Sequence, residues 1–351
     1  MLKFHLSPAI LAALGAAILF GSSTPFAKQL VSDVSPLLLA GLLYLGSGIG
    51  LILARLIKDR GWHSSRLLKN EWLWLLGAIG FGGILAPTLL MIGLTQITAA
   101  TASLLLNLEA VLTALLAWVF FREHTDRRMI FGMLFIVTGG VVLAWPNQLT
   151  QQDWHGSSAI AGACLCWAID NNLTRKISSA DSLFIAGSKG LIAGIVNISL
   201  ALAIGLTFPL WSKISYALLV GFVGYGISLV LFVLALRGLG TARTGAYFSI
   251  APFIGAAIAI VFFNAPTSMV FWISAILMGI GVWIHFTETH EHTHTHEPLF
   301  HNHLHTHDEH HQHTHDFPWD GKEPHTHPHK HEPITHSHHH YPDIHHRHRH
   351  K

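Results

Sequence analysis

A histidine-rich segment at the C-terminal end of the chain has the residue types and spacing of a metal-binding region. Of the 29 histidines, 24 lie between His290 and His350, and many alternate with other residues. An extended chain places alternate residues on one side, and neutral imidazole is a good ligand for Zn, Ni, Co and Cu(II). The segment has no Cys or Met, which disfavours Cu(I). The predicted metal ligands are His290, His292, His294, His296, His301, His303, His305, His307, His310, His311, His313, His315, His325, His327, His329, His336, His338, His339 and His340.

The same histidines also suit a role without metal. With a usual pKa of about 6.5, roughly a quarter of them carry charge at neutral pH, so the segment could be a solubilising or pH-responsive tail. Its low apolar content predicts disorder in the absence of metal. We therefore expect residues 287–351 to form a separate, disordered, His-rich cytoplasmic tail.

A single carboxylate, Glu109, lies about half way along a long apolar stretch at residues 99–121. An ionised side chain at the centre of a membrane span costs roughly 2.5 to 3.5 kcal/mol even on the gentler insertion scales. Glu109 must therefore face the protein interior or a water-filled cavity. It could be a proton site or a partner for a cationic substrate, or a buried carboxylate held only by hydrogen bonds.

Three adjacent polar residues, Asp170, Asn171 and Asn172, fall in another apolar stretch. Successive helical positions turn around the axis, so at least one of them must face inward, and Asp170 is the most costly to expose to lipid. The alternative is that the three residues lie at the cytoplasmic interface as a helix end. Lys189 follows Asp181 by eight residues, and we expect it to extend to the cytoplasmic surface, with a role in a cavity or an ion pair as the alternative.

The elements that must position these residues are membrane-spanning helices. Hydrophobic residues make up 51% of the chain and charged residues 11%, and a span needs about 20 apolar residues. We find no nucleotide-binding motif and no nucleophile–base set in the sequence, so we expect neither an enzyme nor a nucleic-acid-binding protein. The sequence predicts an all-α membrane protein with ten transmembrane helices, over residues 8–27, 36–57, 72–95, 99–121, 129–145, 159–174, 183–206, 216–236, 245–263 and 270–286.

The chain contains an internal repeat. Residues 77–82 read G-x-x-G-F-G, and residues 221–226 read G-x-x-G-Y-G, 144 positions later. Such self-similarity indicates a duplicated unit, and we assign residues 1–146 to the first repeat and residues 157–286 to the second. Each repeat holds five spans, so the second must enter the bilayer from the opposite side. Inverted five-helix repeats of this kind suit alternating access.

Polar residues at matching depths in the two repeats predict a binding site near the bilayer midplane. Asn107 lies two residues before Glu109, and Ser249 is the counterpart of Asn107 in the second repeat. Tyr247 is either an interfacial aromatic residue or a ring on which a substrate stacks. The predicted substrate-binding residues are Asn107, Glu109, Asp170, Asn171, Tyr247 and Ser249.

The distribution of basic residues predicts the orientation. Lys and Arg cluster at residues 58–69 and 122–128, after even-numbered spans, whereas residues 147–156 have none. Cytoplasmic loops carry the excess of basic residues, so both termini are expected in the cytoplasm. Lys28 and Lys213 are exceptions to this pattern.

The fourth predicted span resembles a known family signature. The similarity runs through residues 101–105, 108–117 and 122–123, and residues 244–263 look like a second copy with Pro252 opposite Ala110. This pattern resembles EamA-type members of the drug/metabolite transporter superfamily, and the likeness extends over about residues 8–286. The family's usual Pro after the fourth-span Glu is Ala110 here. The Gly-Glu that usually ends the second copy is replaced by the sequence Asn-Ala-Pro.

The resemblance implies ten helices, a central cavity between the repeats, and transport of small metabolites without ATP. We expect a secondary active transporter, with export as the direction, that moves a small polar metabolite across the inner (plasma) membrane of a bacterium. Transport should need no cofactor, and the tail could bind Ni, Co or Zn. The expected partners are the small-molecule substrate, the lipid bilayer and divalent metal ions, and a homodimer is one assembly that the sequence allows.

Two alternative functions give the tail a central role. The chain could be a nickel, cobalt or zinc efflux transporter, or a membrane-anchored metal buffer or sensor. The predicted spans argue against the first, because no histidine lies in the middle of a span. Two full repeats are more than an anchor requires. Deletion of residues 290–351 separates the hypotheses, because only metabolite transport should survive it.

The topology generates the first testable prediction. Reporter fusions after Asp59 and after Gln152 should report opposite sides of the membrane, cytoplasmic and external respectively, because the basic loops follow the even-numbered spans. The same side for both fusions would contradict the ten-span count.

Overall fold

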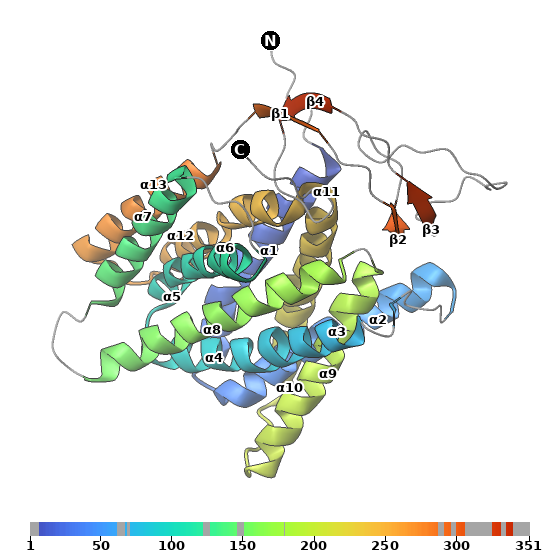
Figure 1. Cartoon of the computed structure of the whole chain (residues 1–351). Coiled ribbons are helices and arrows are strands. Elements are labelled where there is room, and N and C mark those ends of the chain that lie inside the picture. The colour runs from blue at the N-terminus through green and yellow to red at the C-terminus, as the bar shows by residue number, and fades with distance from the viewer. Residues whose placement is uncertain are drawn as a thin grey trace. The chain divides into compact units, whose positions relative to one another are not determined.

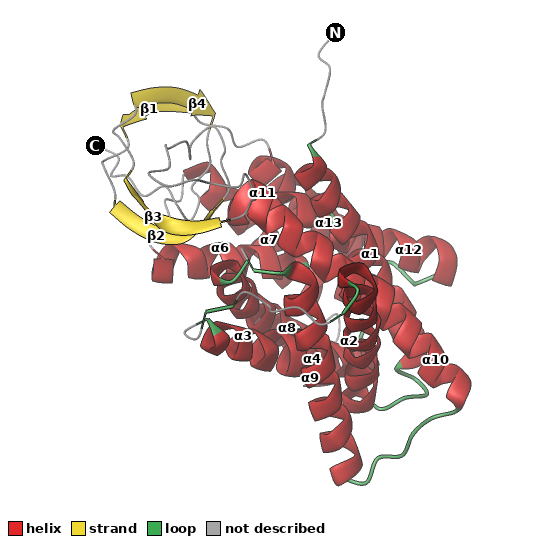
Figure 2. Cartoon of the chain, turned by 90° about the vertical axis from the view of Figure 1, so that its right-hand side faces the viewer, coloured by secondary structure: helices red, strands yellow, loops and turns green. Residues whose placement is uncertain are grey.

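The computed structural model describes residues 7–61, 67–68, 71–121, 127–145, 151–178, 180–286, 291–295, 300–305, 325–330 and 335–339. The chain divides into two units, Met1–Glu288 and Thr289–Lys351. The described secondary structure of the first unit is helical, and that of the second consists of short strands (Figure 2).

The helices of the first unit pack side by side (Figure 1). The first half of this unit contains α1 Pro8–Leu30, α2 Pro36–Asp59, α3 Trp72–Ala78, η1 Ile79–Leu85, α4 Ala86–Gln96, α5 Ala99–Leu105, α6 Asn107–Phe121 and α7 Arg127–Ala144. The second half contains α8 Gln151–Lys176, α9 Ser182–Ala203, α10 Trp211–Val220, η2 Gly221–Ile227, α11 Ser228–Phe248, α12 Ala251–Phe263 and α13 Met269–Phe286.

Each of the ten apolar stretches in the sequence lies within this helical structure. Seven helical stretches in the described residues are long and apolar enough to cross a membrane, and Arg128–Ala144 and Met269–Ile284 are shorter apolar helices. The remaining predicted span lies in α8, which is less apolar because it carries Asp170, Asn171 and Asn172. The structure thus confirms an α-helical membrane protein, while the count of ten spans stays a prediction.

Both glycine-rich motifs form π-helix, a wider helical turn that interrupts the α-helix. The motif at residues 77–82 lies partly in η1, and the motif at residues 221–226 lies in η2. In the first copy Pro87 has no N–H and cannot donate to a carbonyl of the preceding turn. Short π segments of this kind are frequent at functional sites.

Close packing of α2 against α9 depends on glycines. A Cβ atom at Gly48 would overlap the backbone of Leu191, and one at Gly190 would overlap the backbone of Gly48. Further along the same two helices, a Cβ at Gly41 would overlap Ile198. Small residues let helix backbones approach closely within a membrane, where van der Waals packing replaces the hydrophobic effect.

The second testable prediction follows from this packing. Gly48→Ala should lower the free energy of unfolding by about 1 to 3 kcal/mol, because the added methyl group forces α2 and α9 apart. The matched control is Gly279→Ala on α13, where a Cβ meets no atom within 4 Å in the described part of the chain. Thermal unfolding in detergent measures both, and equal melting temperatures would contradict the packing argument.

Four short strands are described in the second unit, and they pair two by two. Strand β1 Glu291–Thr295 pairs with β4 Thr335–His339, and β2 Phe300–His305 pairs with β3 His325–Lys330, both antiparallel. The sequence predicts a disordered tail, and the structure differs at these four segments. Alternation of histidine with threonine and other residues has the two-residue period of a strand, which low apolar content alone does not reveal. The predicted ligands His290, His296, His307, His310, His311, His313, His315 and His340 lie outside the described residues.

Candidate functional site

An ion pair between Asp170 and Lys189 lies inside the helical unit. Asp170 on α8 and Lys189 on α9 are 4% and 2% exposed, and the ammonium donates to the carboxylate. The hydroxyl of Thr174 donates to the other carboxylate oxygen of Asp170 at 3.0 Å. Burial of either charge alone would be strongly unfavourable, so each residue can be buried because the other is present.

The expected position of Lys189 is wrong. The side chain does not extend to the cytoplasmic surface but is among the largest fully buried side chains of the described residues. Its partner Asp170 lies on a neighbouring helix, 19 residues earlier. Sequence spacing relative to Asp181 carries no information about such a contact, because the contact depends on how two helices pack.

A second group of hydrogen bonds surrounds Glu109. The side-chain amide of Asn171 donates to Glu109 Oε1 at 2.9 Å and to Thr113 Oγ1 at 3.3 Å. The amide of Asn172 donates to the Thr113 carbonyl at 3.1 Å. Glu109 and Asn172 are buried, and Asn171 is half-buried. The expectation that Glu109 and Asp170 face the protein interior is therefore confirmed, and these residues do not form an exposed helix end.

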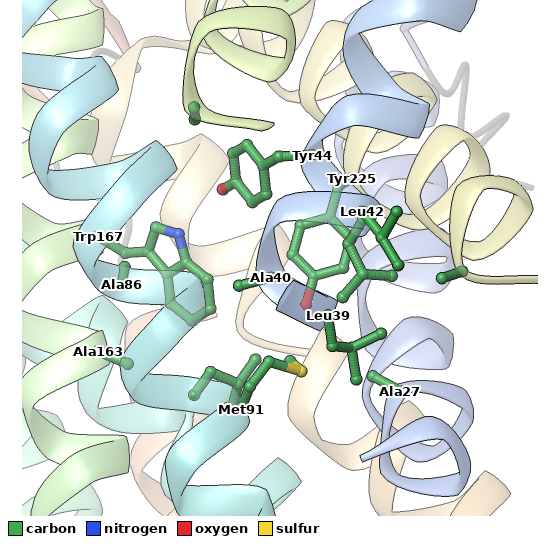
Figure 3. Close-up of a cluster of buried hydrophobic side chains, with 14 of the residues drawn as sticks. Ala27, Leu39, Ala40, Leu42, Tyr44, Ala86, Met91, Ala163, Trp167 and Tyr225 are labelled. Atoms are coloured by element: carbon green, nitrogen blue, oxygen red, sulfur yellow. The ribbon is translucent and has the colours of Figure 1, made fainter. Parts of the chain in front are cut away.

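The carbonyl of Gly82 joins three elements at the same place. The N–H of Ala86 donates to the Phe81 carbonyl, five residues earlier, and Pro87 has no N–H, so the backbone leaves the Gly82 oxygen available. Tyr44 Oη on α2 donates to it at 2.6 Å, and Trp167 Nε1 on α8 donates to it at 3.1 Å. Figure 3 shows these two side chains beside Tyr225 within the buried cluster.

Gly82 also makes room for the ion pair. A Cβ atom at this position would overlap the carboxylate of Asp170. The first glycine-rich motif thus places a backbone carbonyl against Tyr44 and Trp167 and leaves space for the buried carboxylate. In the sequence the motif indicated an internal repeat, and it contained no signal for its contact with Asp170.

Three other predicted substrate-binding residues lie in different surroundings. The side-chain amide of Asn107 donates to the Leu104 carbonyl at 3.1 Å, and the Ser249 hydroxyl donates to the Gly245 carbonyl at 2.7 Å. Both side chains therefore donate a hydrogen bond to a backbone carbonyl in the preceding helical turn. Tyr247 is half-buried and packs with Leu231 and its neighbours on α1 and α11.

A cavity of about 630 Å³ opens where the ends of six helices meet. Its polar lining includes Lys28 and Gln29 at the end of α1, Gln96 at the end of α4, Thr101 on α5 and Asn264 after α12. The Lys28 ammonium donates to the Leu94 carbonyl. In the sequence, Lys28 is an exception to the rule that basic residues follow the even-numbered spans. This unusual position was the available signal that Lys28 lines a cavity.

The opposite ends of the helices are joined by arginine contacts, of which Arg55 is buried and Arg237 is exposed. Arg55 on α2 donates to Asp181 at 2.7 Å, and Arg237 on α11 donates to the Ser178 and Ala180 carbonyls. Burial alone would raise the pKa of Asp181, but hydrogen bonds from Arg55 and from the first backbone N–H groups of α9 lower that pKa below its usual value. Asp181 is thus both the N-cap of α9 and an anionic partner for α2.

This architecture is that of a multi-pass α-helical membrane protein, and comparison with known proteins gives its family. A family model described as the EamA-like transporter family matches residues 7–145 and 154–287. The chain therefore belongs to the EamA-like transporter family, as its resemblance to the family signature predicted.

Individual relatives agree with this assignment. The chain is 30% identical over 290 residues to an uncharacterized transporter of Methanothermobacter thermautotrophicus, which covers 77% of this chain and 83% of the relative. It is 41% identical over 87 residues to a probable 4-amino-4-deoxy-L-arabinose-phosphoundecaprenol flippase subunit ArnE of Pseudomonas fluorescens. This aligned segment covers 24% of this chain and 72% of the relative. A protein of known crystal structure shares the fold, with a TM-score of 0.62, 21% identity, and coverage of 79% of this chain and 95% of that one.

The buried ion pair generates the third testable prediction. Lys189→Met should lower the free energy of unfolding by about 3 to 5 kcal/mol, because it leaves the Asp170 carboxylate buried without its cation. The double variant Asp170→Asn with Lys189→Met should recover most of that loss, since no unpaired charge remains. Thermal or denaturant unfolding of purified protein measures both, and an equally unstable double variant would show that the loss comes from packing.

Proposed function

We propose that the chain is a secondary active transporter that exports a small polar metabolite across the inner (plasma) membrane. The observation that carries this proposal is the group of charged and amide side chains buried in apolar helices, with Asp170, Lys189, Glu109 and Asn171 at its centre. Ionisable residues within membrane spans are expensive, and they mark substrate or proton pathways. Membrane transport is the activity of the family to which the chain belongs.

The transport cycle we propose is alternating access between two inverted repeats. Two structural correspondences support the repeat: each glycine-rich motif coincides with a π segment, and each repeat has a helix break before its last apolar helix pair. The first break falls at Leu106, between α5 and α6, and the second falls at Ser249 and Ile250, between α11 and α12. Broken helices near the midplane are the usual place for a transporter's binding site.

The cavity and the buried polar group lie at different depths along the same helices. Thr101 lines the cavity, and Glu109 follows it by eight residues, which corresponds to about 12 Å along a helix. Under the proposed topology, with both termini in the cytoplasm, the cavity faces the outside. We propose that solute passes between the cavity and a site formed by Glu109, Asp170 and Asn171. Asn107, Ser249 and Tyr247 remain further predicted contributors.

Glu109 is the residue we assign to proton coupling. The Asp170 carboxylate is paired with a lysine, whereas the Glu109 carboxylate accepts from the neutral amide of Asn171. Glu109 can therefore take up or release a proton without separating an ion pair. A carboxylate buried in this way is also suited to a cationic substrate group.

The fourth testable prediction is that Glu109→Gln uncouples transport from the proton gradient. Glutamine keeps the size of the side chain and an oxygen that can accept from Asn171, and it removes only the titration. The variant should insert and fold, still bind or exchange substrate, and fail to accumulate substrate against a gradient. Uphill transport per folded molecule, measured in reconstituted vesicles after substrate screening, is the readout.

The matched control is Glu71→Gln, which makes the same chemical change just before α3. The Glu71 carboxylate accepts a hydrogen bond from the Leu68 N–H. This control should transport normally. If Glu109 is instead a structural residue, Glu109→Gln will lower the yield of folded protein while the remaining molecules transport uphill at the normal rate. Normal pH-driven transport by the variant would remove Glu109 from the mechanism.

The substrate class rests on chemistry and not on a relative's name. The flippase subunit of Pseudomonas fluorescens matches only about a quarter of this chain, so we propose the broader class of small polar metabolites. Nickel, cobalt or zinc efflux remains the alternative, in which the metal ion is the substrate. The described helices contain no group of three or more His, Cys, Asp or Glu side chains arranged to hold a metal ion. Transport that survives deletion of residues 290–351 would favour the metabolite.

A further inference from the structure

The backbone register of the tail strands places histidine opposite histidine. In the β1–β4 pair, His292 lies opposite His338 and His294 lies opposite His336. In the β2–β3 pair the opposed residues are His301 with His329, His303 with His327 and His305 with His325. The two antiparallel pairs therefore contain five registered histidine pairs, contributed by segments that lie far apart in the sequence.

The positions between the histidine pairs carry other residues. Asn302 lies opposite Pro328, Leu304 lies opposite Thr326, and Thr293 lies opposite Ser337. Positions separated by two residues belong to the same face of a strand, so the register assigns the paired histidines of each two-stranded unit to one face. In the β2–β3 pair, a slip of one residue would place every one of these histidines opposite a different residue type.

We infer that each two-stranded unit is a divalent-metal site whose ligands come from both strands. Cβ atoms of directly opposed residues in an antiparallel pair lie about 4.5 to 5.5 Å apart. Two successive histidine pairs thus place four histidines on one face of a two-stranded unit, and zinc most often takes four ligands. Imidazole is also a suitable ligand for nickel, cobalt and copper(II).

Metal binding would also explain how these strands stay paired. An isolated two-stranded hairpin is at best marginally stable in water, and β2 and β3 are separated by 19 residues, 306–324. Ions held between the strands would supply the free energy that an apolar core supplies elsewhere, so binding and strand pairing are coupled. This role is independent of the proposed transport activity, because it depends only on residues of the tail.

The fifth testable prediction compares two variants of the full-length protein that each remove three histidines. The first variant replaces the three paired histidines of β2 by glutamine: His301→Gln, His303→Gln and His305→Gln. Titration of purified protein with Zn²⁺, followed by calorimetry, should show that the ions of this unit are lost or bound at least tenfold more weakly. The control changes His345, His346 and His348 to Gln, outside the paired strands, and should bind Zn²⁺ as the unmodified protein does.

A distance measurement tests the register directly. Spin labels attached at Asn302→Cys and Pro328→Cys, in a protein with Cys164 and Cys166 replaced by Ala, mark opposed positions that carry no histidine. Adding Zn²⁺ should produce a short distance between the labels, and a chelator should remove it. Equal loss of Zn²⁺ binding in both triple variants would overturn the inference, and so would bound Zn²⁺ without a short distance between the labels. Either result would mean that Zn²⁺ binding depends only on the number of histidines in the tail.

Discussion

The buried ion pair between Asp170 and Lys189 is the constraint on which the centre of the helical unit depends. Neither charge is tolerable there without the other, so α8 and α9 must keep the separation and rotation that bring the two side chains together. The requirement extends to a third element, because the carboxylate occupies space that a side chain at Gly82 would fill. One electrostatic contact thereby determines how α8, α9 and η1 fit together.

A membrane interior allows irregular backbone only where each freed polar group finds a partner, and the helix interruptions of this protein follow that rule. At η1, the freed Gly82 carbonyl accepts from Tyr44 and Trp167. At the two helix breaks, Asn107 and Ser249 each donate to a carbonyl of the preceding turn. The need to satisfy backbone carbonyls therefore explains why a polar side chain lies at each of these two helix breaks.

Sequence patterns predicted the features that depend on local composition, and they missed those that depend on packing between distant segments. Hydropathy located the helices, and the cost of burying a charge predicted that Glu109 and Asp170 face inward. The partner of Asp170 was missed because Lys189 lies on another helix, and its burial contradicts the usual behaviour of a lysine near a helix end. The conversion of the glycine motifs to π-helix and the register of the tail histidines likewise depend on long-range contacts.

The distribution of contacts along the helices also relates the structure to a transport cycle. After the end of α1 that lines the cavity, Asp33 forms an ion pair with Lys213, and exposed pairs of this kind contribute at most about 1 kcal/mol. At the other end, Arg55 is 3% exposed and holds Asp181, so separation of those helices must break a largely buried contact. The structure therefore has a cavity at one end and a largely buried arginine contact at the other. In the alternating-access cycle that we propose, opening the second end requires that the Arg55 contact with Asp181 be broken.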